Sequence, residues 1–213
     1  MRGHLITFEG SEGAGKTTQI SLLLEKLEEH GVSFLLTREP GGTALGESIR
    51  HLLKFSGPDI KINPVPELLL FCASRAQLVA EVILPALQQG RVVVCDRFFD
   101  STVVYQFIAR GIGLKHMDAL RELTLGEVWP DLTFVLDIDP KTARNRALRR
   151  TLEEGHDPDR IEAEPLEFYQ KISSAYRQLA ASEPNRVILI QAEKQTVEIA
   201  DEIWKYVAHA LKL

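Results

Sequence analysis

Short apolar runs alternate along the chain with longer segments in which apolar residues recur every three or four positions. The short runs have the length of β-strands, and strands are expected at residues 4–8, 33–37, 91–96, 132–139 and 186–191. The longer periodic segments predict helices at residues 17–30, 43–55, 66–89, 101–110, 115–125, 140–151, 165–182 and 196–211. Pro85 is expected to kink the long helix, and residues 56–64, which contain glycine and proline, to form a loop.

Each expected strand is separated from the next by at least one helix, so hairpins cannot join them. Crossover connections of this kind produce a parallel sheet covered on both faces, which predicts an α/β fold: a three-layer α/β/α sandwich with five parallel strands. The uninterrupted apolar runs 92–94 and 187–190 are typical of strands buried on both faces. Ligands of such sheets bind beyond the carboxyl ends of the strands, so functional residues are expected there.

Composition and charge narrow the class of protein. With 213 residues, 45% of them hydrophobic and 26% charged, the chain is expected to form one globular domain over residues 1–213. The formal net charge of −5 argues against a generally basic surface, so no nucleic-acid partner is expected. No stretch approaches the roughly 18 apolar residues of a membrane span, and the first nine residues meet a charge too early for a signal peptide.

The two cysteines, Cys72 and Cys95, stand far apart and in no spacing typical of metal ligands or redox motifs. Apolar residues flank both, so they are expected to be buried free thiols. Free thiols are typical of a reducing compartment, which predicts a cytoplasmic protein without a membrane partner.

Residues 10–17, with the sequence GSEGAGKT, match the phosphate-binding pattern G-x-x-x-x-G-K-[ST] between an expected strand and an expected helix. Glycines let such a loop wrap phosphate oxygens, and the helix N-terminus adds positive potential. Lys16 is expected to reach the β- and γ-phosphates of ATP, and the Thr17 hydroxyl to ligate Mg²⁺. The pattern predicts a P-loop NTPase fold, which serves kinases, motors and switches alike. The expected ATP-binding residues are Gly10, Ser11, Glu12, Gly13, Ala14, Gly15, Lys16, Thr17 and Thr18.

Charged residues also follow the other expected strands. Arg38 precedes a tight turn and can grip a phosphate with two parallel hydrogen bonds, the alternative being a solvated surface arginine. Asp96 ends an apolar run as a Walker-B-like aspartate that would hold Mg²⁺, and Arg97 beside it could bind phosphate. Asp137 and Asp139 form a second metal candidate, although capping of the following helix is the favoured interpretation there.

A basic helix end is followed by a stretch that contains glycine and proline. Arg146 lies three and four residues before Arg149 and Arg150, which places all three on one helical face. Residues 153–159 are expected to be mobile, so residues 146–162 are predicted to form a lid that closes over phosphates. The alternative is a salt-bridged surface helix.

Phe71 and Arg75 lie four residues apart on the long expected helix and therefore on one face of it. An aromatic ring can stack on a flat base, and a guanidinium can donate to the carbonyl edge of that base. The alternative places Phe71 in the core and Arg75 on the surface. Polar residues that could recognise the edges of a ligand follow the third strand: Ser101, Thr102, Tyr105 and Gln106.

Taken together, these motifs resemble the bacterial thymidylate kinases, within the nucleoside monophosphate kinase group. The resemblance runs over nearly the whole chain. Its most specific parts are REPGGT at residues 38–43 and DR at 96–97 with YQ at 105–106, and it extends to FEG at 8–10, LF at 70–71, RAQ at 75–77 and DRIE at 159–162. The resemblance implies the reaction of ATP with dTMP to give ADP and dTDP, with Mg²⁺ as cofactor, in a homodimer.

The resemblance also implies the residues that bind the acceptor nucleoside. Phe71 would stack on thymine, Arg75 would donate to a thymine carbonyl, and Gln106 would lie near the same base. Tyr105 would lie beside the deoxyribose and disfavour a 2′-hydroxyl, and Glu12 would contact the 3′-hydroxyl or nearby waters.

At the phosphates, the resemblance implies that Arg38 and Arg97 hold the acceptor phosphate and that Asp96 acts through Mg²⁺. Some members of the family carry a catalytic arginine in the phosphate loop. Gly13 occupies that position here, so the chain resembles the members in which lid arginines assist transfer. The implied catalytic residues are Lys16, Arg97, Arg149 and Arg150, with Ser101 among the acceptor-binding residues.

The attacking group in such a reaction is a phosphate oxygen that is already ionised, so no strong general base is required. Two other functions stay open: a kinase of the same architecture with a different acceptor, and a nucleotide-dependent switch without an acceptor. The Asn-Lys-x-Asp string of guanine-binding switches is absent from the sequence. Dependence of ATP turnover on added dTMP distinguishes these functions.

Overall fold

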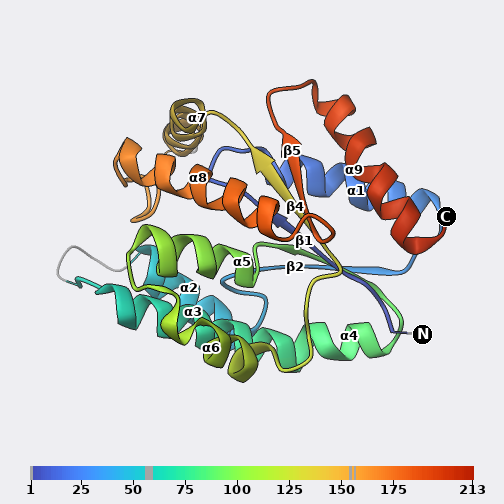
Figure 1. Cartoon of the computed structure of the whole chain (residues 1–213), viewed down its shortest axis with the longest axis horizontal. Coiled ribbons are helices and arrows are strands. Elements are labelled where there is room, and N and C mark those ends of the chain that lie inside the picture. Colours follow the sequence, from blue (N-terminus) through green and yellow to red (C-terminus); the bar gives the residue numbers. More distant parts are fainter. Residues whose placement is uncertain (1, 56–59, 154, 156) are drawn as a thin grey trace.

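The computed structural model describes residues 2–55, 60–153, 155 and 157–213 (Figure 1). Five strands form one sheet in the order β2-β3-β1-β4-β5, and every pairing is parallel. The predicted five-stranded parallel sheet is therefore confirmed. The strands are β1 (Leu5–Glu9), β2 (Phe34–Arg38), β3 (Val92–Asp96), β4 (Leu132–Asp137) and β5 (Val187–Gln191).

Helices cover both faces of this sheet (Figure 1). Apolar residues of α1 and α9 pack on one face, where Phe8 and Phe134 are fully buried. The opposite face is covered by α3, α4 and α5 over β1 and β3, and by α8 over β4 and β5. The α-helices are α1 (Lys16–Glu29), α2 (Ala44–Phe55), α3 (Pro64–Leu78), α4 (Leu84–Gln88), α5 (Phe99–Thr102), α6 (Met117–Leu125), α7 (Pro140–Glu153), α8 (Leu166–Ser182) and α9 (Thr196–Leu211).

Two of the expected helices contain π-helical turns. Between α3 and α4 lies the π-helical segment η1 (Val79–Ile83), so the irregularity expected at Pro85 begins six residues earlier. Proline lacks an N–H and its ring clashes with the carbonyl four residues before it, so the preceding turn widens. The segment expected as one helix at 101–110 is α5 followed by the π-helical η2 (Val103–Ala109). Of the expected loop 56–64, residues 56–59 lie outside the described residues.

The helical stretch Pro64–Gln88 is more apolar than expected. Its mean hydropathy reaches 1.6, and by length and composition alone it could cross a membrane. The expectation that no stretch approaches a membrane span was therefore wrong. In the structure, Leu68, Leu78 and Ile83 of this stretch are buried against the sheet, as in the core helix of a folded domain. Packing over β1 and β3 explains part of this apolar character, since 39% of the apolar window is buried.

The sheet order brings the predicted functional segments to one edge. In the strand register, Arg38 of β2 lies beside Asp96 of β3, and Asp96 lies beside Phe8 of β1. The loops that follow these three neighbouring strands therefore leave the sheet at the same place, as expected for parallel strands. Residues that are far apart in the sequence can converge there.

Candidate active site

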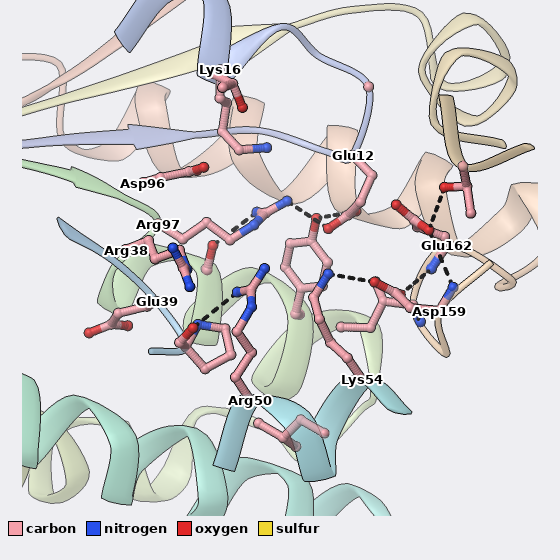
Figure 2. Close-up of a pocket in the computed structure, with 18 of the residues that line it drawn as sticks. Glu12, Lys16, Arg38, Glu39, Arg50, Lys54, Asp96, Arg97, Asp159 and Glu162 are labelled. Carbon is pink, nitrogen blue, oxygen red and sulfur yellow. Dashed lines mark hydrogen bonds and ion pairs between the residues drawn. The ribbon is translucent and has the colours of Figure 1, made fainter. Parts of the chain in front are cut away.

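A cavity of about 850 Å³ opens at this edge of the sheet, bordered by the loop after β1, by α2 and α3, and by the end of α7 (Figure 2). Figure 2 shows Lys16, Arg97, Arg38 and Arg50 converging on it from different elements. Of the predicted phosphate-loop residues, Gly10, Ser11 and Ala14 do not line the cavity. All the other predicted site residues line it: Glu12, Gly13, Gly15, Lys16, Thr17, Thr18, Arg38, Phe71, Arg75, Asp96, Arg97, Ser101, Tyr105, Gln106, Arg149 and Arg150.

The loop between β1 and α1 has the backbone that phosphate binding requires. Gly13 and Gly15 both have positive φ values, and Lys16 is the first residue of α1. The Lys16 ammonium group donates to the carbonyl oxygens of Gly10 at 3.2 Å and Ser11 at 3.0 Å. Burial and the nearby Arg97 charge lower the pKa of Lys16 to about 8. A bound polyanion would stabilise the charged form of this lysine.

An ion pair joins the phosphate loop to the end of β3. Arg97, which has a strained left-handed backbone at φ 69°, donates to Glu12 at 2.7 Å and to Ser101 at 3.2 Å. The Tyr105 hydroxyl donates to the same Glu12 carboxylate at 3.0 Å. Burial opposes the charge on Glu12, but the Arg97 and Lys16 charges outweigh it and hold the pKa of Glu12 below its ordinary value. In this state Glu12 is paired with the Arg97 guanidinium, the group that was predicted to bind phosphate.

The Glu9 carboxylate holds the segment that follows β3 through hydrogen bonds. It is fully buried and accepts hydrogen bonds from the backbone N–H of Phe98 at 2.8 Å, from the Ser101 hydroxyl at 2.6 Å and from Tyr176 at 2.7 Å. Burial and the nearby Asp100 raise the pKa of Glu9 to about 7. These bonds position the segment that carries Arg97.

Oxygen donors suited to Mg²⁺ are present at the same edge. One carboxylate oxygen of Asp96, Oδ1, is buried and has no hydrogen-bond partner among the residues that the structure describes, and Thr17 lines the cavity. Mg²⁺ takes few protein ligands and keeps waters and substrate phosphates, so one carboxylate and one hydroxyl fit it. The second candidate is not a metal site: Asp137 pairs with Arg177 at 2.9 Å, and Asp139 caps α7 through the N–H of Thr142. Capping was the favoured interpretation for Asp139.

The predicted base-binding pair also lines the cavity. Phe71 is half-buried there, whereas only 1% of Arg75 is exposed, which rules out the surface alternative for this arginine. The Arg75 Nε donates to Glu39 at 2.8 Å, and its Nη2 donates to Glu39 at 2.5 Å and to the carbonyl of Phe98 at 3.2 Å. Its Nη1 is buried without a partner among the described residues. A buried donor of this kind favours a ligand acceptor, because an unsatisfied group is costly.

The predicted lid helix α7 packs directly on the phosphate loop. A Cβ added at Gly13 would lie 2.3 Å from the Ala143 carbonyl oxygen and 3.1 Å from the Cβ of Arg146. Among the three arginines, Arg146 is thus the one whose backbone adjoins the loop, although it was not in the expected catalytic set. Arg149 is 77% exposed and pairs with Glu153, and Arg150 pairs with Glu162 at 2.7 Å.

The segment after α7 is tied to α2 and α3. Asp159 pairs with Lys54 at 2.5 Å and Arg160 pairs with Glu67 at 2.5 Å. Residues 154 and 156 lie outside the described residues, and the mobility of residues 153–159 stays a prediction. Both ends of the lid segment therefore contact the walls of the cavity in this state.

Sequence reasoning assigned no role to several of the lining side chains. Arg50 and Lys54 stand four residues apart on α2 and both line the cavity. Their spacing was visible in the sequence, but only the apolar face of that helix was interpreted. Arg50 donates to the carbonyl of Pro40 at 3.0 Å, and burial and the nearby Arg38 lower its pKa. The pairing of Glu39 with Arg75 had no signal in sequence spacing.

Comparisons with known proteins agree on one family. The family model described as "Thymidylate kinase" matches residues 8–203. A thymidylate kinase of Synechococcus sp. (strain JA-2-3B'a(2-13)) is 45% identical over 98% of this chain and 96% of its own length, and one of Pelobacter propionicus is 46% identical over 94% and 92%. The crystal structure of thymidylate kinase from Ehrlichia chaffeensis matches with a TM-score of 0.75 and 35% identity, covering 97% of this chain and 99% of that chain.

The contact between Gly13 and α7 leads to a first prediction. Gly13→Ala places a methyl group against backbone atoms of α7 and adds left-handed backbone strain. If α7 stays in place, the free energy of unfolding should fall by about 3–5 kcal/mol. If α7 moves away to relieve the clash, ATP turnover should fall instead. Both quantities are measured, by urea denaturation and by a coupled ATP assay.

Gly31→Ala is the matched control, since Gly31 has φ 66° and open space around an added Cβ. This substitution introduces only the left-handed backbone strain, so it should lower the free energy of unfolding by about 1–2 kcal/mol and leave ATP turnover unchanged. If Gly13→Ala behaved like Gly31→Ala in both assays, the packing of α7 on the phosphate loop would be wrong.

Proposed function

The chain belongs to the thymidylate kinase family, and on that premise we propose that it transfers the γ-phosphoryl group of ATP to dTMP, giving ADP and dTDP. One observation carries the proposal. A single cavity is lined both by Lys16 and Thr17 of the phosphate loop and by Phe71 and Arg75 of α3. Two nucleotides bound end to end in it would have their phosphates between the loop and Arg97.

The donor end supplies backbone and charge for a triphosphate. The glycine-rich loop offers N–H groups and the N-terminus of α1, and Lys16 would exchange its contacts with the carbonyls of Gly10 and Ser11 for phosphate oxygens. Asp96 and Thr17 would hold Mg²⁺, which would neutralise charge on the phosphates when bound.

The acceptor end supplies a stacking surface and hydrogen-bond donors. Phe71 offers an aromatic face, and the unpartnered Nη1 of Arg75 offers a donor for a base carbonyl. Tyr105 and Glu12, joined by a 3.0 Å hydrogen bond, would border the sugar. Arg97 would leave Glu12 for the acceptor phosphate, and Arg38 would join it there.

Transfer requires little covalent chemistry from the protein. The acceptor oxygen is ionised at neutral pH, so catalysis consists of alignment of the two phosphates and stabilisation of the charge that spreads over the transferred group. Lys16, Arg97 and an arginine of the lid would provide that charge, with Arg146 closest to the loop by backbone and Arg149 and Arg150 one turn further along α7. Closure of the lid would exclude water, which competes as an acceptor.

We also propose a cytoplasmic homodimer. Cys72 and Cys95 are both buried free thiols, which fits a reducing compartment. On α3 and its continuation, exposed apolar side chains recur at intervals of four or seven residues and form a stripe along the helix. The stripe consists of Val65, Leu69, Ala73, Ala80 and Leu84. A second copy of the chain, packed along this stripe, would cover it.

A coupled assay with different acceptors tests the activity. ATP turnover should rise by roughly two orders of magnitude or more when dTMP is added, because the acceptor completes the aligned pair of phosphates. Thymidine, dCMP and dGMP should be much poorer acceptors. Lys16→Ala should lose most of the dTMP-dependent rate while its thermal unfolding stays cooperative. A turnover rate that ignores dTMP would indicate a switch, and a preference for thymidine would indicate a nucleoside kinase.

The pKa of Lys16 predicts a pH dependence. Above pH 8 the free protein holds Lys16 largely neutral, so binding of the triphosphate must include uptake of a proton. The kcat/KM for ATP should therefore fall about tenfold per pH unit above about pH 8, whereas kcat at saturating ATP should keep its value to higher pH. A kcat/KM profile that stays flat to about pH 9.5 would contradict this.

Leu69→Glu tests the dimer. Leu69 is 53% exposed in the middle of the stripe, and a buried carboxylate there would oppose association. Light scattering at micromolar concentration should give the mass of a dimer for the wild type and of a monomer for the variant. Val197→Glu on α9, also exposed, is the control and should stay dimeric. A monomeric wild type would rule the dimer out.

A further inference from the structure

We propose that Glu67 is a specificity-determining positioning residue, which fixes the side-chain amide of Gln106 in the orientation that accepts a ring N–H from the acceptor base. The inference rests on the proposed function and adds a reason why the site prefers thymine to cytosine. Glu67 belongs to the same face of α3 as Phe71 and Arg75, at successive intervals of four residues.

Glu67 and Gln106 form a buried pair behind the base-binding end of the cavity. Gln106 Nε2 donates to Glu67 Oε1 at 2.8 Å, and the exposed fractions of the two residues are 1% for Glu67 and 2% for Gln106. Gln106 lines the cavity together with Phe71 and Arg75. Glu67, which does not itself line this cavity, therefore contacts a residue that does, Gln106.

The chemistry of this pair determines which way the amide faces. A carboxylate can only accept hydrogen bonds, so Gln106 must present its NH₂ group to Glu67. Its Oε1 is then the amide atom left for a ligand, and no described residue donates a hydrogen bond to it. The Nη1 of Arg75 is a donor without a partner among the described residues.

A site that offers one acceptor and one donor to the edge of a base distinguishes the pyrimidines. Thymine and uracil present N3–H next to the O4 carbonyl, which matches the Gln106 oxygen and the Arg75 donor. Cytosine presents a bare N3 acceptor next to an NH₂ group, which opposes both. If the Gln106 amide could rotate, its NH₂ group would satisfy the cytosine N3, and half of the discrimination would disappear.

Two arginines hold the Glu67 carboxylate in place. Arg110 Nε lies 3.3 Å from Oε1, and Arg160 Nη2 lies 2.5 Å from Oε2. Arg160 belongs to the predicted lid segment, so the lid segment and the base-reading amide contact the same carboxylate. With both oxygens occupied by cations, the carboxylate stays an acceptor toward Gln106.

The test compares dTMP with dCMP. Glu67→Gln keeps the shape of the side chain but allows either end of its amide to face Gln106, so Gln106 can rotate. The ratio of kcat/KM for dTMP to that for dCMP should fall roughly tenfold to hundredfold, with the KM for ATP unchanged. A loss of packing alone would lower both rates and leave the ratio intact.

A double-mutant cycle with Gln106→Ala tests whether Glu67 acts through Gln106. In that background, Glu67→Gln should leave the ratio unchanged, because the group it positions is absent. Glu164→Gln is the matched control: Glu164 also pairs with Arg110 but does not contact Gln106. It should keep the wild-type ratio.

Glu67→Asp provides a second variant if Glu67→Gln folds poorly in a thermal melt, since it keeps a negative charge near both arginines while the shorter side chain withdraws the carboxylate from Gln106. It should lower the ratio as well. Two results would overturn the role of Glu67 and leave the proposed function standing. The first is a wild-type preference for dTMP whose ratio does not change in these variants, and the second is additive effects of the two substitutions in the cycle. A wild-type chain that phosphorylates neither nucleotide would overturn the proposed function and this role with it.

Discussion

Three arginines around the cavity each have a carboxylate partner inside the protein. Arg97 is held by Glu12, Arg75 by Glu39, and Arg160 by Glu67. A guanidinium withdrawn from water without a partner would be strongly destabilising, so the protein carries its own counterions. In the proposed reaction a phosphate replaces Glu12 at Arg97, whereas Arg75 keeps its ion pair with Glu39 and Arg160 keeps its ion pair with Glu67.

Close packing sets a second condition on the site. Gly13 has no side chain where α7 crosses the phosphate loop, and an added Cβ would meet the Ala143 carbonyl. The same absence lets the backbone of Arg146 approach the loop. A phosphate-loop arginine at position 13 and this close approach of α7 are therefore sterically exclusive.

The parts that were predictable from sequence depend on local patterns. Apolar runs located all five strands, and the glycine spacing located the phosphate loop, because both reflect interactions between near neighbours. The pairing of Arg75 with Glu39 and of Gln106 with Glu67 joins residues 36 and 39 positions apart, so no periodicity reveals it. The interrupted helices η1 and η2 and the strand order likewise depend on tertiary packing. The choice of Arg149 and Arg150 as catalytic arginines stays a prediction; helical spacing alone did not show that Arg146 lies beside Gly13.

A crystal structure with dTMP and a non-hydrolysable ATP analogue tests the central claim most directly. The account predicts both nucleotides in the one cavity, with the thymine ring on Phe71, its carbonyl at the Nη1 of Arg75, and Arg97 turned from Glu12 to the acceptor phosphate. A complex in which dTMP binds elsewhere, or in which Arg97 keeps its contact with Glu12 while both nucleotides are bound, would contradict it.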